Sequence, residues 1–103
     1  MASNKDYLDY VLEQLSLLEE INYRMMMSEY IIYYKGKITG GIYDNRFLIK
    51  QCKASLKMLP KAEKVSPYPG AREMLLVDEI ENREFLYELI NRMYDELPAT
   101  KKK

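Results

Sequence analysis

Apolar residues recur with helical spacing at both ends of the chain. Near the N-terminus such a stripe predicts an amphipathic helix over about residues 4–18, and it comprises Leu8, Val11, Leu12, Leu15 and Leu18. Ser3 followed by Asp6 resembles a capping box at the start of this helix. A second stripe predicts a helix from about Asn82 to Leu97, ended by Pro98, and it comprises Leu86, Leu89, Ile90, Met93 and Leu97. Each helix must bury its apolar side against another element.

Between the helices the pattern changes to short strands joined by tight turns. Runs of β-branched, aromatic and Met residues without a helical stripe predict strands at residues 24–28, 30–34, 38–43, 46–50 and 72–78. Lys35-Gly36 and Asp44-Asn45 supply residues that tolerate positive φ in two of the turns. In the fourth strand, alternation predicts that Phe47 and Ile49 point to one side and Arg46, Leu48 and Lys50 to the other.

Two details of this region have both a structural and a functional interpretation. The pair Gly40-Gly41 predicts a bulge or a closely packed helix in preference to an approaching ligand. Cys52 begins an apolar stripe in a short helical segment that Pro60 ends, which predicts a small buried hydrophobe in preference to a nucleophile. Residues 61–70, with Pro67-Tyr68-Pro69-Gly70, read as a loop.

The order helix, four strands, short helix, strand, long helix predicts an α+β fold. We expect two layers, with a mostly antiparallel sheet of about five strands packed by the N-terminal and C-terminal amphipathic helices. A chain of 103 residues is expected to form one domain, here residues 1–98, followed by a disordered basic tail at residues 99–103.

Composition argues against catalysis. The chain has no histidine, and no nucleophile elbow, phosphate-binding loop, dinucleotide fingerprint or zinc-binding cysteine pair is present. The sequence therefore predicts neither catalytic residues nor a cofactor or metal site. A single cysteine favours a reducing compartment, and no apolar run approaches a signal core or a membrane span, so we expect a cytoplasmic protein without a membrane partner.

Charge is zero in total but segregated along the chain. Residues 35–64 carry eight basic side chains against Asp44 and Glu63, while both flanks are acidic. Such a basic segment can bind nucleic-acid phosphates, or it can let elements of opposite sign pack together. Zero net charge and a pI near 6.3 weigh against a nucleic-acid binder. The candidate contacts for a partner protein or a nucleic acid are Arg24, Met26, Lys35, Lys37, Arg46, Lys50, Lys53 and Lys57.

The run Met25-Met26-Met27 is the strongest indication of a protein partner. Flexible Met side chains adapt to irregular surfaces, although they also fill cores. Exposure of Met26 within an apolar patch would favour the interaction hypothesis. Exposed sheet edges would also permit a homodimer.

Several short motifs, taken in order, give the chain a family resemblance. They are Tyr10-Val11, Leu15-Ser16, Arg24-Met25, Tyr30 to Tyr33, Gly36, Asp44, Phe47-Leu48-Ile49-Lys50, Pro67-Tyr68 and the helix from Asn82 to Leu97. Over residues 7–97 this order resembles the N-terminal domain of the TfoX/Sxy competence regulators. That family usually continues Arg-Met with Phe-Gly-Gly-Tyr, where this chain has Met26-Met27-Ser28-Glu29-Tyr30, and full-length members carry a second domain.

The resemblance implies a two-layer α/β fold shared with type III secretion chaperone-like domains. It also implies a regulatory interaction module, with a role in transcription or competence regulation through protein partners. Binding of nucleic acid through residues 35–64 is the alternative.

Overall fold

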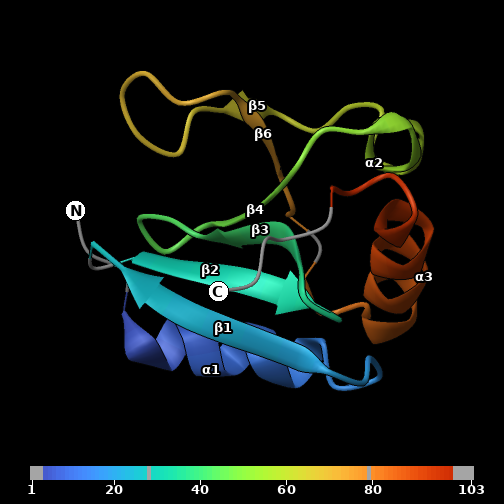
Figure 1. Cartoon of the computed structure of the whole chain (residues 1–103), viewed down its shortest axis with the longest axis horizontal. Coiled ribbons are helices and arrows are strands. Elements are labelled where there is room, and N and C mark those ends of the chain that lie inside the picture. Colours follow the sequence, from blue (N-terminus) through green and yellow to red (C-terminus); the bar gives the residue numbers. More distant parts are fainter. Residues whose placement is uncertain (1–3, 28, 79, 99–103) are drawn as a thin grey trace.

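The computed structural model, which describes residues 4–27, 29–78 and 80–98, is an α+β fold (Figure 1). Its elements are α1 (Lys5–Gln14), β1 (Ile21–Met26), β2 (Glu29–Tyr34), β3 (Lys37–Ile42), β4 (Phe47–Ile49), α2 (Lys53–Met58), β5 (Lys64–Val65), β6 (Met74–Leu76) and α3 (Arg83–Tyr94). The strands form one antiparallel sheet in the order β1-β2-β3-β4-β6-β5. The predicted fold class is confirmed, with six strands in place of about five.

Both long helices begin at an asparagine cap. The Asn4 side chain accepts a hydrogen bond from the Asp6 backbone N–H at 2.7 Å, and the Asn82 side chain accepts one from the Phe85 N–H at 3.1 Å. Asn4 is therefore the cap of α1; Ser3, which the sequence suggested, lies outside the described residues. Helix α1 ends at Gln14, earlier than predicted, and the chain continues through turns.

The strand connections follow the turn chemistry of the sequence. Lys35, Gly36, Asp44 and Asn45 all have positive φ, between 50° and 84°, which confirms both predicted turns. Strand β1 starts at Ile21, three residues before the predicted start. Its predicted end at Ser28 and the predicted tail at residues 99–103 lie outside the described residues.

The glycine pair marks a bulge between β2 and β3. Ile32 lies opposite Gly40 but Tyr33 lies opposite Ile38, so Thr39 has no opposite residue. The buried Thr39 hydroxyl donates a hydrogen bond to the Ile32 carbonyl at 3.2 Å. A Cβ on Gly40 would lie 2.7 Å from the Ile49 Cα of β4. Close approach of neighbouring backbones thus accounts for the glycines, and the predicted bulge is confirmed.

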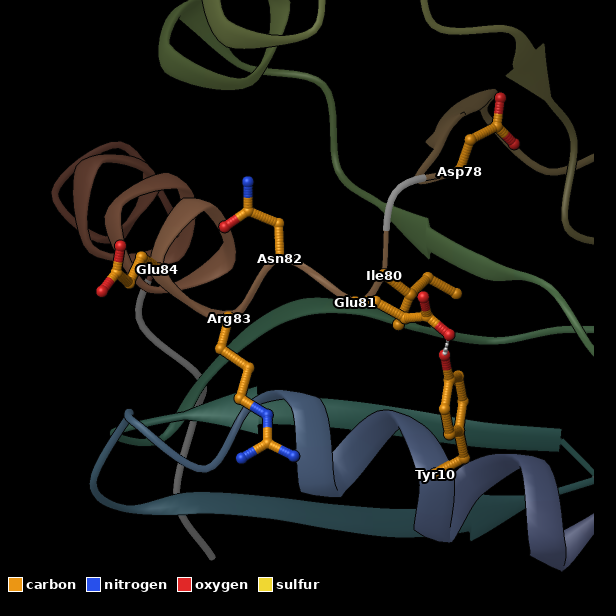
Figure 2. Close-up of a pocket in the computed structure, with 7 residues that line it drawn as sticks. All are labelled: Tyr10, Asp78, Ile80, Glu81, Asn82, Arg83 and Glu84. Carbon is orange, nitrogen blue, oxygen red and sulfur yellow. Dashed lines mark hydrogen bonds between the residues drawn. The ribbon is translucent and has the colours of Figure 1, made fainter.

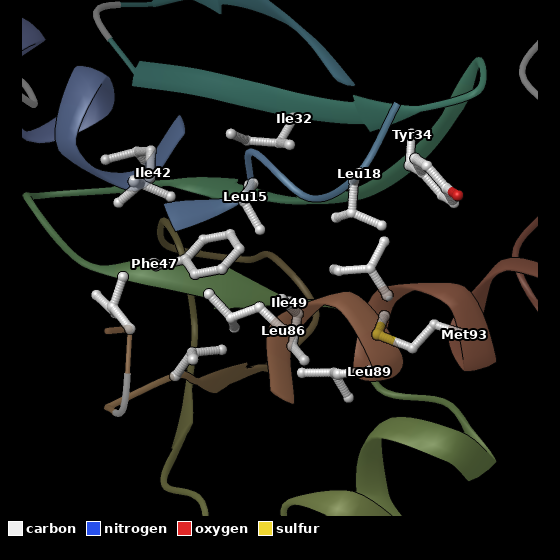
Figure 3. Close-up of a cluster of buried hydrophobic side chains, with 14 of the residues drawn as sticks. Leu15, Leu18, Ile32, Tyr34, Ile42, Phe47, Ile49, Leu86, Leu89 and Met93 are labelled. Atoms are coloured by element: carbon white, nitrogen blue, oxygen red, sulfur yellow. The ribbon is translucent and has the colours of Figure 1, made fainter. Parts of the chain in front are cut away.

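The two faces of the sheet differ. The inner face packs on α1 and α3: Tyr30, Ile32 and Tyr34 point to it, and Figure 3 shows Ile32 and Tyr34 among the helix side chains. The core also contains Leu8, Val11 and Leu15 of α1 and Leu86, Leu89, Ile90 and Met93 of α3. Phe47 and Ile49 belong to this cluster, whereas the fully buried Leu48 does not. The predicted alternation of β4 is confirmed.

Three predictions between residues 51 and 78 need correction. Cys52 is not inside a helix but is the half-buried N-cap of α2, where its N–H donates to the Ser55 hydroxyl at 2.8 Å. The predicted loop at 61–70 contains the two-residue strand β5, and the strand predicted at 72–78 is shortened to β6. Helix α2 packs beside α3 at one end of the sheet (Figure 1). These elements are too short for a periodic signal.

Candidate functional site

The outer face of β1, β2 and β3 is the side of the sheet opposite α1 and α3. On β2 it carries Ile31 and Tyr33, which are half-buried and are absent from the core cluster. Arg24 lies opposite Ile31 and Met26 lies opposite Glu29, so both share this face. Met26 is 47% exposed, and the residue opposite it on this face is the charged Glu29. Along β2 this face is therefore apolar at Ile31 and Tyr33, and within the described residues α1 and α3 pack on the other face.

A groove of about 370 Å³ lies on this outer face, between the strands and residues 66–73. Its apolar lining includes Ile31, Ile38 and Met74. Tyr43 and Tyr68 add aromatic rings, and the Tyr68 side chain is 60% exposed. We call this feature the outer-face groove. Its size is in the range of small-ligand pockets, roughly 300–1,000 Å³.

Hydrogen bonds fix the loop that forms one wall of the groove. The Ser66 hydroxyl lies 3.0 Å from the Tyr68 carbonyl oxygen and 2.7 Å from that of Ala71, and it bridges the two ends of the turn. The Gln51 side-chain amide donates to the Glu73 carbonyl at 2.9 Å, which ties the loop to the end of β4. The groove is thus shaped by backbone contacts as well as by the sheet.

The electrostatics of this face are cationic. Lys50 and Arg72 line the groove together with Glu73. Arg46 exchanges backbone hydrogen bonds of 2.9 and 3.0 Å with Tyr43, so it shares the same face. Its buried Nε–H has no acceptor among the described residues. The cations Arg24, Arg46, Lys50 and Arg72 outnumber the acidic Glu29 and Glu73 on this face, so the face favours an anionic partner.

Tyr43 has a raised pKa at the groove. Burial raises the pKa of its phenol above the ordinary value, and the neighbouring Tyr68 adds to the shift. At neutral pH the hydroxyl is therefore protonated and can donate a hydrogen bond to a bound carboxylate or carbonyl.

The other predicted basic residues lie elsewhere. Lys37 sits 4.0 Å from the Tyr94 ring centroid and donates to the Tyr94 carbonyl at 3.0 Å, near the end of α3. Lys35 lies over the Tyr34 ring at 5.2 Å, and interaction with Tyr34 raises its pKa. These two lysines pack on aromatic rings that belong to the body of the fold.

Lys53 and Lys57 lie on α2, where acidic groups surround them. The Glu96 carboxylate accepts from the backbone N–H groups of Lys53 and Ala54 at 2.8 and 3.0 Å. Lys57 borders a hollow between α2 and α3 that is also lined by Glu84, Glu88, Asp95 and Glu96. The eight candidates therefore fall into separate groups, and Arg24, Met26, Arg46 and Lys50 are those on the outer face.

A second hollow, of about 810 Å³, lies where α1 meets the start of α3 (Figure 2). The Tyr10 hydroxyl donates to the Glu81 carboxylate at 2.7 Å, and this hydrogen bond is the main cause of a raised pKa at Tyr10. Asp78 and Glu84 lie apart from this pair, at opposite ends of the hollow (Figure 2). Because the carboxylates do not converge, the arrangement does not resemble an acid–base pair.

Arg83 crosses from α3 to α1 beside this hollow. Its Nε lies 3.3 Å from the Gln14 side-chain oxygen, and its Nη2 lies 3.5 Å from the Glu13 carboxylate. These contacts join the two helices that cover the inner face. We assign this region a structural role.

Within residues 4–27, 29–78 and 80–98, no group of three or more His, Cys, Asp or Glu side chains could hold a metal ion. No helix of this part of the chain is long and apolar enough to cross a membrane.

Sequence reasoning missed several residues of the outer-face groove. Ile31 and Tyr43 carried a signal, because they alternate with the core residues of their strands. Ile38 did not, because simple alternation puts it on the same side as Ile42, and only the bulge at Thr39 moves it to the outer face. Tyr68 and Arg72 come from the loop before β6, and nothing local in the sequence indicates that this loop folds back toward the sheet.

Comparison with known proteins gives little further information. No family model matches the chain, and no solved structure shows a significant match. A protein of Spirochaeta aurantia, described as an uncharacterized 12.7 kDa protein in the trpE 5' region, is 29% identical over 102 residues. The match covers 98% of this chain and 89% of that relative, so the similarity includes the segments that form the outer-face groove.

Proposed function

We propose that the chain is a non-catalytic interaction module that binds an extended segment of a partner protein on its outer sheet face. The carrying observation is the apolar outer face of β2 and β3, which none of the helices in the described residues covers and which is hollowed by the outer-face groove. Met26 extends this surface to the edge of the sheet. An extended segment fits because side chains at alternate positions can enter a groove of this kind.

The charges favour a segment that carries acidic side chains. On the outer face of β1 to β4, Arg24, Arg46 and Lys50 outnumber the acidic Glu29, and Glu73 is the acidic residue of the groove wall. Arg72 adds a further cation at the groove. Acidic side chains of the partner would pair with these cations, and its apolar side chains would cover Ile31 and Ile38.

A protein segment accounts for this surface better than a nucleic acid does. The nucleic-acid alternative uses the basic segment 35–64, but Lys35, Lys37, Lys53 and Lys57 lie away from the groove among aromatic or acidic side chains. The cations of this segment are therefore spread over several surfaces, which disfavours binding along a phosphate backbone. The groove lining is largely apolar. The resemblance to the TfoX/Sxy family suggests regulation of transcription or competence in the cytoplasm, and this part of the proposal rests on the sequence alone.

Affinity capture with matched charge reversals tests the proposal. Tagged wild-type protein, Lys50→Glu and Lys57→Glu are used as baits in native lysate, with and without nuclease. Lys57→Glu is the control, because it makes the same charge change on α2, away from the outer face. The far-ultraviolet circular dichroism of each bait establishes that it is folded.

We expect one protein to be retained by wild type and Lys57→Glu after nuclease treatment, and lost with Lys50→Glu. The purified partner should then bind wild type and Lys57→Glu more tightly than Lys50→Glu. Equal capture by all three baits, or no stoichiometric protein in any of them, would contradict the proposal. Loss of binding on nuclease treatment would favour the nucleic-acid alternative.

A further inference from the structure

The two edges of the sheet differ in how well they resist pairing with another strand. Strand β5, at one edge, has two residues, and Lys64 is one of them. Strand β1, at the other edge, has six residues and contains no Pro, no Lys and no bulge against β2. Short strands and charged side chains, especially lysines, protect sheet edges, whereas β1 is long and carries one charged residue, Arg24. Along it, every residue from Asn22 to Met26 is exposed.

The pairing with β2 determines which backbone groups of β1 point outward. The Lys35 N–H donates to the Glu20 carbonyl at 3.1 Å, which makes Glu20 and Lys35 a hydrogen-bonded pair. Such pairs alternate along an antiparallel ladder, so Asn22 and Arg24 bond to β2. The N–H and C=O groups of Ile21, Tyr23 and Met25 therefore point to the free edge.

The side chains of these three residues lie on the inner face, because their partners on β2 are Tyr34, Ile32 and Tyr30. Tyr23 packs edge-on against Tyr30, with ring centroids 5.9 Å apart. The Met25 side chain is 60% exposed. Beside Ile21 and Tyr23 lies a groove of about 380 Å³ whose lining also includes Leu12, Leu15 and Leu18. We call it the edge groove.

We propose that two copies of this chain pair antiparallel through β1, about a two-fold axis at Tyr23. Tyr23 then lies opposite Tyr23 of the second copy, and Ile21 lies opposite its Met25. In this register all the outward backbone groups are satisfied, which gives about six hydrogen bonds between the copies. Each exposed Met25 falls beside Ile21 of the other copy, where the edge groove receives it.

Arg24 favours the register with its axis at Tyr23 over the registers with the axis one residue away. It is the charged residue of β1, and in the Tyr23-centred register it lies opposite Asn22 of the second copy. A shift of the axis to Arg24 would place the two guanidinium groups directly opposite each other, which is destabilising. A shift of the axis to Asn22 would leave Met25 without an opposite residue in β1.

This inference concerns the edge of the sheet and so goes beyond the proposed function, which uses the outer-face groove. Light scattering after size-exclusion chromatography, over a range of concentrations, tests it first. We expect a species of twice the 12.3 kDa chain mass. Met25→Pro removes an outward N–H and leaves the ladder to β2 intact, whereas Met25→Ala removes only the side chain.

We expect Met25→Pro to raise the dissociation constant of the dimer about 100-fold or more and Met25→Ala about tenfold or less. Circular dichroism should show both variants folded. A monomer at every concentration, or equal dimerisation of wild type and Met25→Pro, would overturn the inference.

Disulfide cross-linking tests the register between the two β1 strands of the dimer. In a Cys52→Ala background, Tyr23→Cys, Arg24→Cys and Met25→Cys are each oxidised. Opposed residues of the proposed dimer have Cα atoms roughly 5.5 Å apart, within disulfide range, so Tyr23→Cys should cross-link efficiently. The two Met25 positions would be roughly 14 Å apart and should not cross-link. Preferential cross-linking at Arg24→Cys or Met25→Cys would refute the Tyr23-centred register.

Discussion

The substitution Gly40→Ala tests whether backbone approach explains the glycine pair. Gly40 lies at the bulge between β2 and β3, and β4 packs against its Cα. A Cβ there would overlap the Leu48 carbonyl oxygen and lie 2.7 Å from the Ile49 Cα. Since both obstacles are backbone atoms, no side-chain rotation can relieve the clash, and β3 and β4 must separate.

The expected loss of stability is large. Overpacking in a core typically costs about 1–3 kcal/mol, and an obstacle of backbone atoms places Gly40→Ala at or above about 3 kcal/mol. For a chain of this size the total free energy of unfolding is about 5–15 kcal/mol. The midpoint of thermal unfolding should therefore fall by about 12–24 °C. Urea unfolding, followed by far-ultraviolet circular dichroism, measures the change in the free energy of unfolding.

Two other glycines supply matched controls. Nothing lies within 4 Å of a Cβ placed on Gly36 or Gly70, although both have positive φ. Alanine at Gly36 should thus cost only the backbone term, roughly 1–2 kcal/mol, and asparagine there should cost less, because it tolerates this conformation. At Gly40 asparagine should be at least as harmful as alanine. Equal losses for Gly40→Ala and Gly36→Ala would refute the steric explanation.

Two further changes have defined outcomes. Asn82→Ala removes the side chain that caps α3 through the Phe85 N–H, and it should lower the free energy of unfolding by about 1 kcal/mol in urea titrations; an unchanged midpoint would contradict this role. The folded-state pKa of Tyr43 is raised by burial, so the folded protein holds this proton more tightly and its stability should fall as the pH rises above about 10. Tyr43→Phe should reduce this alkaline loss, measured as the pH dependence of unfolding; an identical pH profile would contradict it.

Elements with a strong local signal were predictable from the sequence. The apolar stripes predicted both that α1 and α3 form and which of their sides are buried. Lys35-Gly36 predicted a hairpin turn, because few residues tolerate positive φ. Boundaries were less predictable: the cap of α1 is Asn4, one residue after the position that the sequence suggested, since neighbouring residue types can both serve as caps. Strand β5 was missed because two residues cannot establish a periodic pattern.

The candidate site was predictable only in part. Alternation placed Arg46 and Lys50 on the side opposite the core residues of β4, and the structure brings them to the outer face. Clustering in sequence suggested that Lys53 belongs with them, but the turn after β4 carries it to α2, where Glu96 binds the backbone. The contribution of Tyr68 depends on tertiary folding of its loop, which has no local signal.

Mapping the bound partner on the sheet tests the central claim most directly. Backbone amide chemical shifts of labelled protein are recorded with and without the purified partner that affinity capture identifies. We expect the largest changes at outer-face positions such as Ile31, Ile38 and Tyr43, with little change at Lys57 on α2. Changes confined to α2 and α3, with the outer face unaffected, would contradict the account.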